Sequence, residues 1–199
     1  MTKKSNIEWL PKALPIFPLP GAIILPKGTL PLNIFEPRYI SMVENVLGTH
    51  RMIGMIQPLK SQNDKKKIYP IGCAAKIVAF SETSDNRFLI ELKGVIRFKV
   101  IKELKSTNGF RNIEPNWNIY KDDLELNFDN IDIEELLNQL KKYFINNSIN
   151  VDLNELAKIS KEQIVSSIPQ ICSFKTNEKQ AILEAKTEKD RVEVLISLL

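Results

Sequence analysis

Residues 14–42 read LPIFPLPGAIILPKGTLPLNIFEPRYISM, and the prolines in this stretch decide how the first part of the chain folds. Proline fixes φ and has no backbone N–H, so it is poorly tolerated inside a helix or a central strand. Five prolines of this stretch occur before residue 32, namely Pro15, Pro18, Pro20, Pro26 and Pro31. We therefore expect this stretch to remain outside central sheet pairing.

An apolar run lies between two of these prolines, after a turn that Gly21 predicts. It consists of Ala22, Ile23, Ile24 and Leu25. If the prolines hold this loop open, it forms an exposed apolar patch that contacts unfolded chains. The alternative is that the loop folds over the sheet.

A helix is predicted to begin at Pro37, because proline suits the first helical position, and to end at Gly48. Apolar residues recur between them at helical spacing: Tyr39, Met42, Val43, Val46 and Leu47. We expect this apolar stripe to cap an open end of the sheet.

Strand patterns dominate the rest of residues 13–118. In FLIELKGVIRFKV, residues 88–100, apolar residues alternate with charged ones, which predicts a half-buried strand. The charged set, expected to face outward, is Glu91, Lys93, Arg97 and Lys99. Gly94 lies on the inward side, where a missing side chain suits a β-bulge.

Two further strands are predicted at residues 51–57 and 71–80. The polar sequence TSDNR at residues 83–87 separates the second of these from the strand that follows it. We expect these five residues to form a hairpin loop.

After residue 118 the periodicity becomes helical. Two apolar stripes carry this pattern: Ile133, Leu136, Leu137, Leu140 and Phe144, then Val192, Leu195, Ile196 and Leu199. Residues 153–159 and 162–171 predict shorter helices between them. Thr176 and Thr187 are predicted caps of the last two helices, the second helped by Asp190. The acidic stretch at residues 121–132 is the one candidate hinge between the β-rich and helical halves.

Three motifs together resemble the LON substrate-binding domain, the non-catalytic N-terminal domain of Lon-type ATP-dependent proteases, also found as a free-standing small bacterial protein. They are LPIFPLPG at residues 14–21, LNIFEPRY at residues 32–39 and EKQAILEA at residues 178–185. The resemblance covers about residue 13 to the C-terminus. It implies an α+β fold, in which an N-terminal β-rich PUA-like pseudobarrel with one helix is followed by a C-terminal helical bundle.

On this basis we expect an N-terminal tail (residues 1–12), a β-rich LON-type subdomain (13–119) and an α-helical subdomain (120–199). The resemblance implies a non-catalytic protein- or peptide-binding module, an adaptor or chaperone-like factor in protein quality control. Its expected partners are unfolded or extended polypeptide and a Lon-type protease. Peptide-contacting residues are expected at Ile23, Ile24, Leu25, Phe35, Glu36, Arg38 and Tyr39.

Two of those residues have a stronger structural interpretation. Arg38 suits pairing with a nearby carboxylate, and Tyr39 suits packing of its ring while the hydroxyl finds a backbone partner. The two interpretations make different predictions, because a binding rim must be exposed and a packed side chain must be buried.

The sequence lacks the motifs of an enzyme. There is no P-loop spacing and no GxGxxG, so no nucleotide cofactor is expected, and the Ser-Lys peptidase domain of full Lon proteases is absent. His50 is the sole histidine, and Cys73 and Cys172 are far apart without a CxxC pair, so no metal site is expected. We therefore expect no peptidase activity, and a hydrolase with an unusual site is the least favoured hypothesis.

Charge is distributed unevenly along the chain. Residues 1–119 carry 18 Lys and Arg against 9 Asp and Glu, whereas residues 120–199 carry 10 against 15. The basic half supports an alternative function, RNA or nucleic-acid binding through a PUA-like basic β face. Only six of the 28 basic residues are arginine, which weakens that alternative because arginine recognises phosphate better than lysine does.

The apolar runs of the sequence are short. None approaches the roughly 20 residues that cross a bilayer, and the N-terminus has no apolar segment long enough for a signal peptide. We therefore expect a cytoplasmic protein without a membrane partner.

Overall fold

The computed structural model of the 199-residue chain describes residues 6–59, 67–105, 109–150 and 159–199. Its strands are β1 (Leu14–Pro18), β2 (Thr29–Ile34), β3 (Met52–Ile56), β4 (Ile71–Glu82), β5 (Phe88–Leu104) and β6 (Arg111–Asn116). Its helices are α1 (Pro37–Leu47), the 3₁₀ helix η1 (Asn118–Glu125), α2 (Glu134–Asn146), α4 (Lys161–Ile171), α5 (Thr176–Glu184) and α6 (Glu188–Leu198). The predicted α+β class is confirmed.

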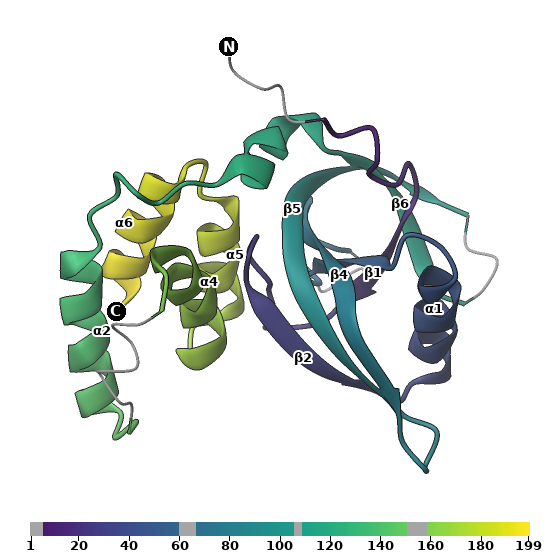
Figure 1. Ribbon diagram of the computed structural model, residues 1–199, viewed down its shortest axis with the longest axis horizontal. Coiled ribbons are helices and arrows are strands. Elements are labelled where there is room, and N and C mark those ends of the chain that lie inside the picture. The colour runs from purple at the N-terminus through teal and green to yellow at the C-terminus, as the bar shows by residue number, and fades with distance from the viewer. Residues whose placement is uncertain (1–5, 60–66, 106–108, 151–158) are drawn as a thin grey trace.

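The six strands form one sheet that closes on itself. Their order is β2-β5-β4-β3-β1-β6, and β6 also pairs with β5, so a ring of five strands forms with β2 attached to its outside. The pairing of β1 with β3 is parallel and the other pairings are antiparallel. Figure 1 shows α2, α4, α5 and α6 gathered on one side of the strands and α1 on the other.

Prolines of the opening stretch do enter the sheet, so the expectation that they remain outside central pairing is wrong. β1 lies between β3 and β6, but the two pairings are staggered along it. Pro15 pairs in register only with β6, and Pro18 pairs in register only with β3. Each of these prolines is therefore paired with a neighbouring strand on one side only, so a residue without a backbone N–H is tolerated there. Pro31 lies in β2, an edge strand.

A β-bulge divides β5 into two parts, as Gly94 predicts. Ala75 is in register with Gly94 and Ala74 with Ile96, so Val95 is the extra residue. An extra residue exchanges the two faces of a strand, because successive side chains point to opposite sides. Arg97 therefore lies on the same face of the sheet as Gly94, and its side chain is buried. The prediction that it points outward with Glu91 is wrong.

Two hydrophobic clusters occupy the two faces of the sheet. β3 shows the division, since Met52 and Ile56 belong to one cluster and Ile53 and Met55 to the other. All five strands of the ring contribute to the smaller cluster, which lies inside the ring. The larger cluster combines the other face of the sheet with α1 and the four C-terminal helices. The helices are therefore part of the same core as the strands.

Helix boundaries follow local capping residues. α1 begins at Pro37 and is followed by Gly48, as predicted. The predicted Thr187 cap is confirmed, because its Oγ1 accepts from the Asp190 N–H at 3.1 Å. Thr176, however, is the first residue of α5 rather than its cap. Lys175 precedes that helix, and its N–H donates to the Glu178 carboxylate at 2.7 Å.

The predicted strands at residues 51–57, 71–80 and 88–100 correspond to β3, β4 and β5 and are confirmed, as is the hairpin loop at residues 83–87. The stripes around Leu136 and Leu195 lie in α2 and α6, and residues 162–171 lie in α4. The helix predicted at residues 153–159 lies, except for Ile159, outside the described residues.

Residues 121–132 do not form a free hinge. Their first part belongs to η1, and both Asp123 and Phe128 are buried. Asp123 accepts hydrogen bonds from Arg97 of β5, which ties the connection between strands and helices to the sheet. The acidic composition misled the prediction, because one of the acids is a buried structural partner rather than a solvated loop residue.

Candidate functional site

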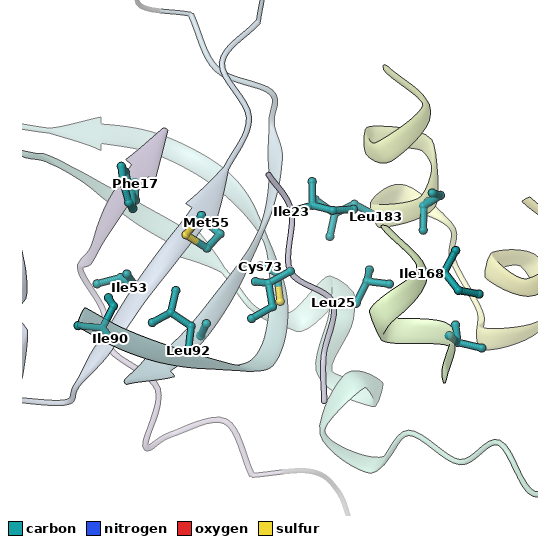
Figure 2. Packing of buried hydrophobic residues seen from close by; sticks show 14 of the residues in the cluster. Phe17, Ile23, Leu25, Ile53, Met55, Cys73, Ile90, Leu92, Ile168 and Leu183 are labelled. Carbon is teal, nitrogen blue, oxygen red and sulfur yellow. The ribbon is translucent and has the colours of Figure 1, made fainter. Parts of the chain in front are cut away.

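The apolar residues expected to form an open patch are buried. Ile23, Ile24 and Leu25 are at most 3% exposed and belong to the larger cluster. Figure 2 shows Ile23 and Leu25 between Cys73 and Leu92 on the strand side and Leu183 and Ile168 on the helix side. The expectation that these three residues are exposed is therefore wrong, and the alternative, in which the loop folds over the sheet, is correct.

Hydrogen bonds hold this interlayer loop (residues 19–28) from both sides. On the strand side, the Lys27 N–H donates to the Gly94 carbonyl at 3.0 Å and the Gly94 N–H donates to Gly28 at 2.9 Å. On the helix side, Gln170 of α4 donates to the Ile23 carbonyl at 3.1 Å, and Lys179 of α5 donates to Gly21 at 2.8 Å. The loop therefore occupies the space between the strands and the C-terminal helices and is bonded to both.

The FEPRY segment (residues 35–39) contains the exposed members of the predicted site. Phe35 is 63% exposed, and the Arg38 and Glu36 side chains form a surface ion pair at 2.7 Å. The Arg38 guanidinium also lies 4.5 Å from the centre of the Tyr39 ring. The structure therefore brings Phe35, Glu36 and Arg38 together at the N-terminal end of α1.

Tyr39 belongs to the core rather than to the rim. Its ring packs on Phe17 with a centroid distance of 4.2 Å, and the residue is buried in the larger cluster. Burial raises the pKa of the Tyr39 hydroxyl, and the nearby Arg38 opposes that rise. The ring of Tyr39 packs in the core, as the structural interpretation predicts, and Arg38 is held against that ring.

A second exposed apolar surface was missed from the sequence. It lies on the projecting ribbon, which we define as β2 together with residues 77–82 of β4 and 88–93 of β5. Val78 and Phe80 of β4 form this exposed surface. Leu89 of β5 is also exposed but lies on the face opposite Phe80, because its register partner is Ser81. Figure 1 shows the hairpin of β4 and β5 extending away from the ring. The sequence did contain one signal of this surface. The segments predicted as the two strands of the hairpin are longer than β3, so β3 cannot pair with β4 over its whole length.

The ribbon and the FEPRY segment are neighbours. Ile34 and Glu82 are the register partners of Phe88 on its two sides, and Phe35 directly follows Ile34. The exposed Phe35 is therefore at the same end of the ribbon as the last residues of β4. These two apolar surfaces are the candidate binding region of the molecule.

A buried ion pair joins the ring to the helical layer, and no local sequence pattern predicted it. Arg97 Nη2 lies 2.7 Å from Asp123 Oδ1, and the Arg97 guanidinium lies 4.3 Å from the Tyr120 ring centre. Arg97 also donates to carbonyls at the end of α5, including that of Leu183 at 3.1 Å and that of Ala185. A cation at a helix C-terminus satisfies carbonyls that have no partner in the helix.

A second arginine, Arg191 of α6, lies close to this pair and is only 1% exposed. Its Nε and Nη2 atoms are buried without a hydrogen-bond partner among the described residues. Burial and the charge of Arg97 lower its pKa to about 10, and Asp123 opposes the shift. Asp123 is thus the buried partner of Arg97, and together with Glu188 it opposes the lowering of the Arg191 pKa.

Side chains capable of catalysis serve structural roles here. His50 Nδ1 accepts from the Met52 N–H at 3.0 Å, and burial lowers the pKa of the imidazole.

Across the described part of the chain, His, Cys, Asp and Glu form no cluster of three or more suited to a metal ion. No helix in that part of the chain has the length and apolar character needed to cross a bilayer.

The two cysteines are buried and free, which predicts low reactivity. Burial raises the pKa of both thiols, that of Cys172 to about 11. The thiolate is the reactive form, so at about pH 8 we expect the native protein to react slowly with Ellman's reagent. Both thiols should react at once in guanidinium chloride. Rapid reaction of a native thiol would show that its surroundings open readily.

These features define a class of protein, a closed ring of strands fused to a helical layer, with exposed apolar side chains at one end of a projecting ribbon. The chain matches the family model described as the ATP-dependent protease La (LON) substrate-binding domain over residues 13–199, and it belongs to that family. The predicted resemblance is confirmed.

Two solved structures share the fold. A Lon N-terminal domain protein from Xanthomonas campestris aligns with a TM-score of 0.65 at 20% identity, covering 94% of this chain and 98% of that one. The N-terminal domain of the Mycobacterium avium complex Lon protease aligns with a TM-score of 0.67 at 13% identity, covering 94% and 97%. At these identities the likeness concerns the fold alone.

Curated relatives are longer than this chain. Lon protease 2 of Myxococcus xanthus is 24% identical, and the match covers 98% of this chain and 24% of that protein. The Lon protease of Buchnera aphidicola subsp. Acyrthosiphon pisum is 26% identical, with 94% and 24% covered. The chain therefore spans about a quarter of the length of these relatives.

Proposed function

We propose that this chain is a non-catalytic module that binds unfolded or extended polypeptide, acting as an adaptor or chaperone-like factor in cytoplasmic protein quality control. The observation that carries the proposal is the family match, which extends over residues 13–199. The exposed Phe35, beside an Arg38 fixed by Glu36 and Tyr39, supports it, because exposed apolar groups rimmed by polar ones suit contact with other chains. A Lon-type protease is a further proposed partner.

Binding of an unfolded protein tests this function. Reduced, carboxymethylated α-lactalbumin labelled with a fluorophore should bind the purified chain without ATP, whereas native α-lactalbumin should not. The expected anisotropy change depends on apolar contact, so it should persist at moderate salt. Failure to distinguish unfolded from native α-lactalbumin contradicts the proposal. Binding of a single-stranded RNA instead, with an affinity that falls steeply with salt, would support the nucleic-acid alternative.

Phe35→Ala should weaken that binding about fivefold, because an exposed aromatic at the centre of a contact contributes on the order of 1 kcal/mol. Its high exposure means that the midpoint of urea unfolding should not change. Ile145→Ala is the matched control, since Ile145 is 77% exposed but lies on α2, on the helical side of the molecule. Equal effects of the two substitutions would remove Phe35 from the site.

The non-catalytic part of the proposal has its own test. Casein incubated with the chain, with and without ATP, should remain intact on a denaturing gel. The described side chains support this result, because His50, Cys73 and Cys172 are engaged in turns or buried in the core. Cleavage that copurifies with the chain would overturn it.

A further inference from the structure

The outer edge of β4 is unpaired over its last residues. β3 accompanies β4 only from Cys73 to Lys76, and the Ile77 N–H then donates to the Arg51 carbonyl at 2.8 Å. Residues 79–82 pair with β5 on the inner side, Val78 is the extra residue of a second β-bulge, and residues 78–82 are all exposed. In the ranges that the structure describes, no backbone hydrogen bond reaches their outer side.

This edge is protected only near its two ends, by the bulge at Val78 and the charge of Glu82. Natural sheet edges are commonly blocked by proline, lysine or a covering element, because an open edge pairs with other chains. The opposite edge of the ribbon follows that rule, since β2 contains Pro31 and α4 packs beside its start, where Ser166 lies against Gly28. Residues 78–82, VAFSE, contain neither proline nor lysine.

Backbone geometry indicates the occupant of such an edge. A row of unpaired N–H and C=O groups along a strand is satisfied by another extended backbone, with alternate side chains fitting alternate sites. Phe80 provides an apolar site on one face of the ribbon, where it lies edge-on against Phe88 with a centroid distance of 4.9 Å. A bound segment would place every second side chain on this face.

Charge at the start of the open edge indicates one end of the occupant. Lys76, the last residue of β4 paired with β3, is the register partner of Lys93 of β5, so two like charges share one face, with Glu91 two residues along β5 as the acid nearest in sequence. Like charges opposite one another destabilise a sheet. An acidic residue of an added strand would relieve that repulsion.

We propose that residues 78–82 of β4 accept an extended polypeptide as an added strand, with apolar side chains at alternate positions and an acidic residue toward Lys76. This inference rests on the proposed polypeptide-binding function and specifies where and how the chain is held. The recognised chemistry is an unpaired backbone rather than a particular sequence.

A labelled peptide tests the proposal in the full chain. The probe is a seven-residue fluorescein-labelled peptide of alternating valine and threonine that ends in aspartate. Its counterpart is methylated at alternate backbone nitrogens on the side that would face β4, which leaves the side chains intact but removes the N–H donors. We expect the methylated peptide to bind at least about tenfold more weakly, because strand addition depends on those hydrogen bonds.

Phe80→Lys should lower the affinity for the unmethylated peptide by a similar factor, because it introduces a charge at the edge. Leu89→Lys is the matched control and should change it less than about twofold. Leu89 has a similar exposure, 45% against 39% for Phe80, but lies on β5, the middle strand of the ribbon. Urea unfolding of both variants reports any loss of folding. The comparison of the two peptides uses the unsubstituted protein, so it does not depend on how well the variants fold.

Three results would overturn the inference. The first is equal binding of the two peptides. The second is failure of both peptides to bind while unfolded α-lactalbumin still binds, which would leave the proposed function intact. The third is a dimer in sedimentation velocity that Phe80→Lys dissociates, because the edge would then pair with a second copy. Failure of both the peptide and unfolded α-lactalbumin to bind would instead reject the proposed function itself.

Discussion

Asp123→Asn is expected to lower the free energy of unfolding by about 3–5 kcal/mol, because it leaves buried charge without compensation. Asp123 is the carboxylate that pairs with Arg97, and both side chains are almost fully buried. Arg191 adds a second buried guanidinium nearby. Urea denaturation followed by circular dichroism should therefore show a large fall in the midpoint, with the slope unchanged if the native fold is retained.

Two substitutions serve as controls for this result. Arg191→Met should leave stability unchanged or raise it by about 1 kcal/mol, because it removes a guanidinium of which Nε and Nη2 are unsatisfied and keeps the Arg97 pair intact. Glu114→Gln breaks an exposed pair with Lys102 and should cost no more than about 1 kcal/mol. If Asp123→Asn were as mild as Glu114→Gln, the buried pair would not be what joins the ring to the helices.

Gly94→Ala is expected to destabilise the protein by about 3 kcal/mol or more. A Cβ at this position would lie 2.0 Å from the Leu25 carbonyl oxygen and 2.8 Å from its carbon, and these are backbone atoms that cannot move aside independently. The displacement would strain the interlayer loop and weaken the two hydrogen bonds of Gly94, those to Lys27 and Gly28. Thermal and urea unfolding measure the loss.

The expected sign is the opposite of that for an ordinary glycine in a strand, where alanine is favoured by roughly 0.5–1 kcal/mol. Gly48→Ala is the matched control, since Gly48 has a negative φ and its nearest neighbour is Asn45 O at 3.8 Å. It should change stability by less than about 0.5 kcal/mol. A neutral Gly94→Ala would mean that the loop is free to move away from the strand.

Local patterns predicted the elements whose partners are near in sequence. The helix from Pro37 and the Thr187 cap depend on residues within one or two turns, and both were correct. The alternation in residues 88–100 correctly indicated a strand, and Gly94 correctly marked a bulge. A bulge exchanges the two faces beyond it, however, so the alternation predicted the wrong side for Arg97.

The exposure of the candidate site residues was harder to predict, because burial depends on partners far along the chain. Ile23 and Leu25 form an apolar run that looks exposed when only their neighbouring prolines are considered. Their covering residues, Ile168 and Leu183, lie more than a hundred positions later. The exposed Phe80 illustrates the reverse case, since an apolar residue in a strand pattern is expected to be buried unless the neighbouring strand is known to stop.

The position of the interlayer loop has a consequence for synthesis on the ribosome. Ile23 to Leu25 leave the exit tunnel long before α5, which supplies Leu183 to cover them. At about 5–20 residues per second, the intervening chain takes roughly 8–30 s to make. During that interval we expect the nascent protein to expose an apolar segment of its own, so a polypeptide proposed to bind unfolded chains should itself be open to chaperone binding until α5 is made.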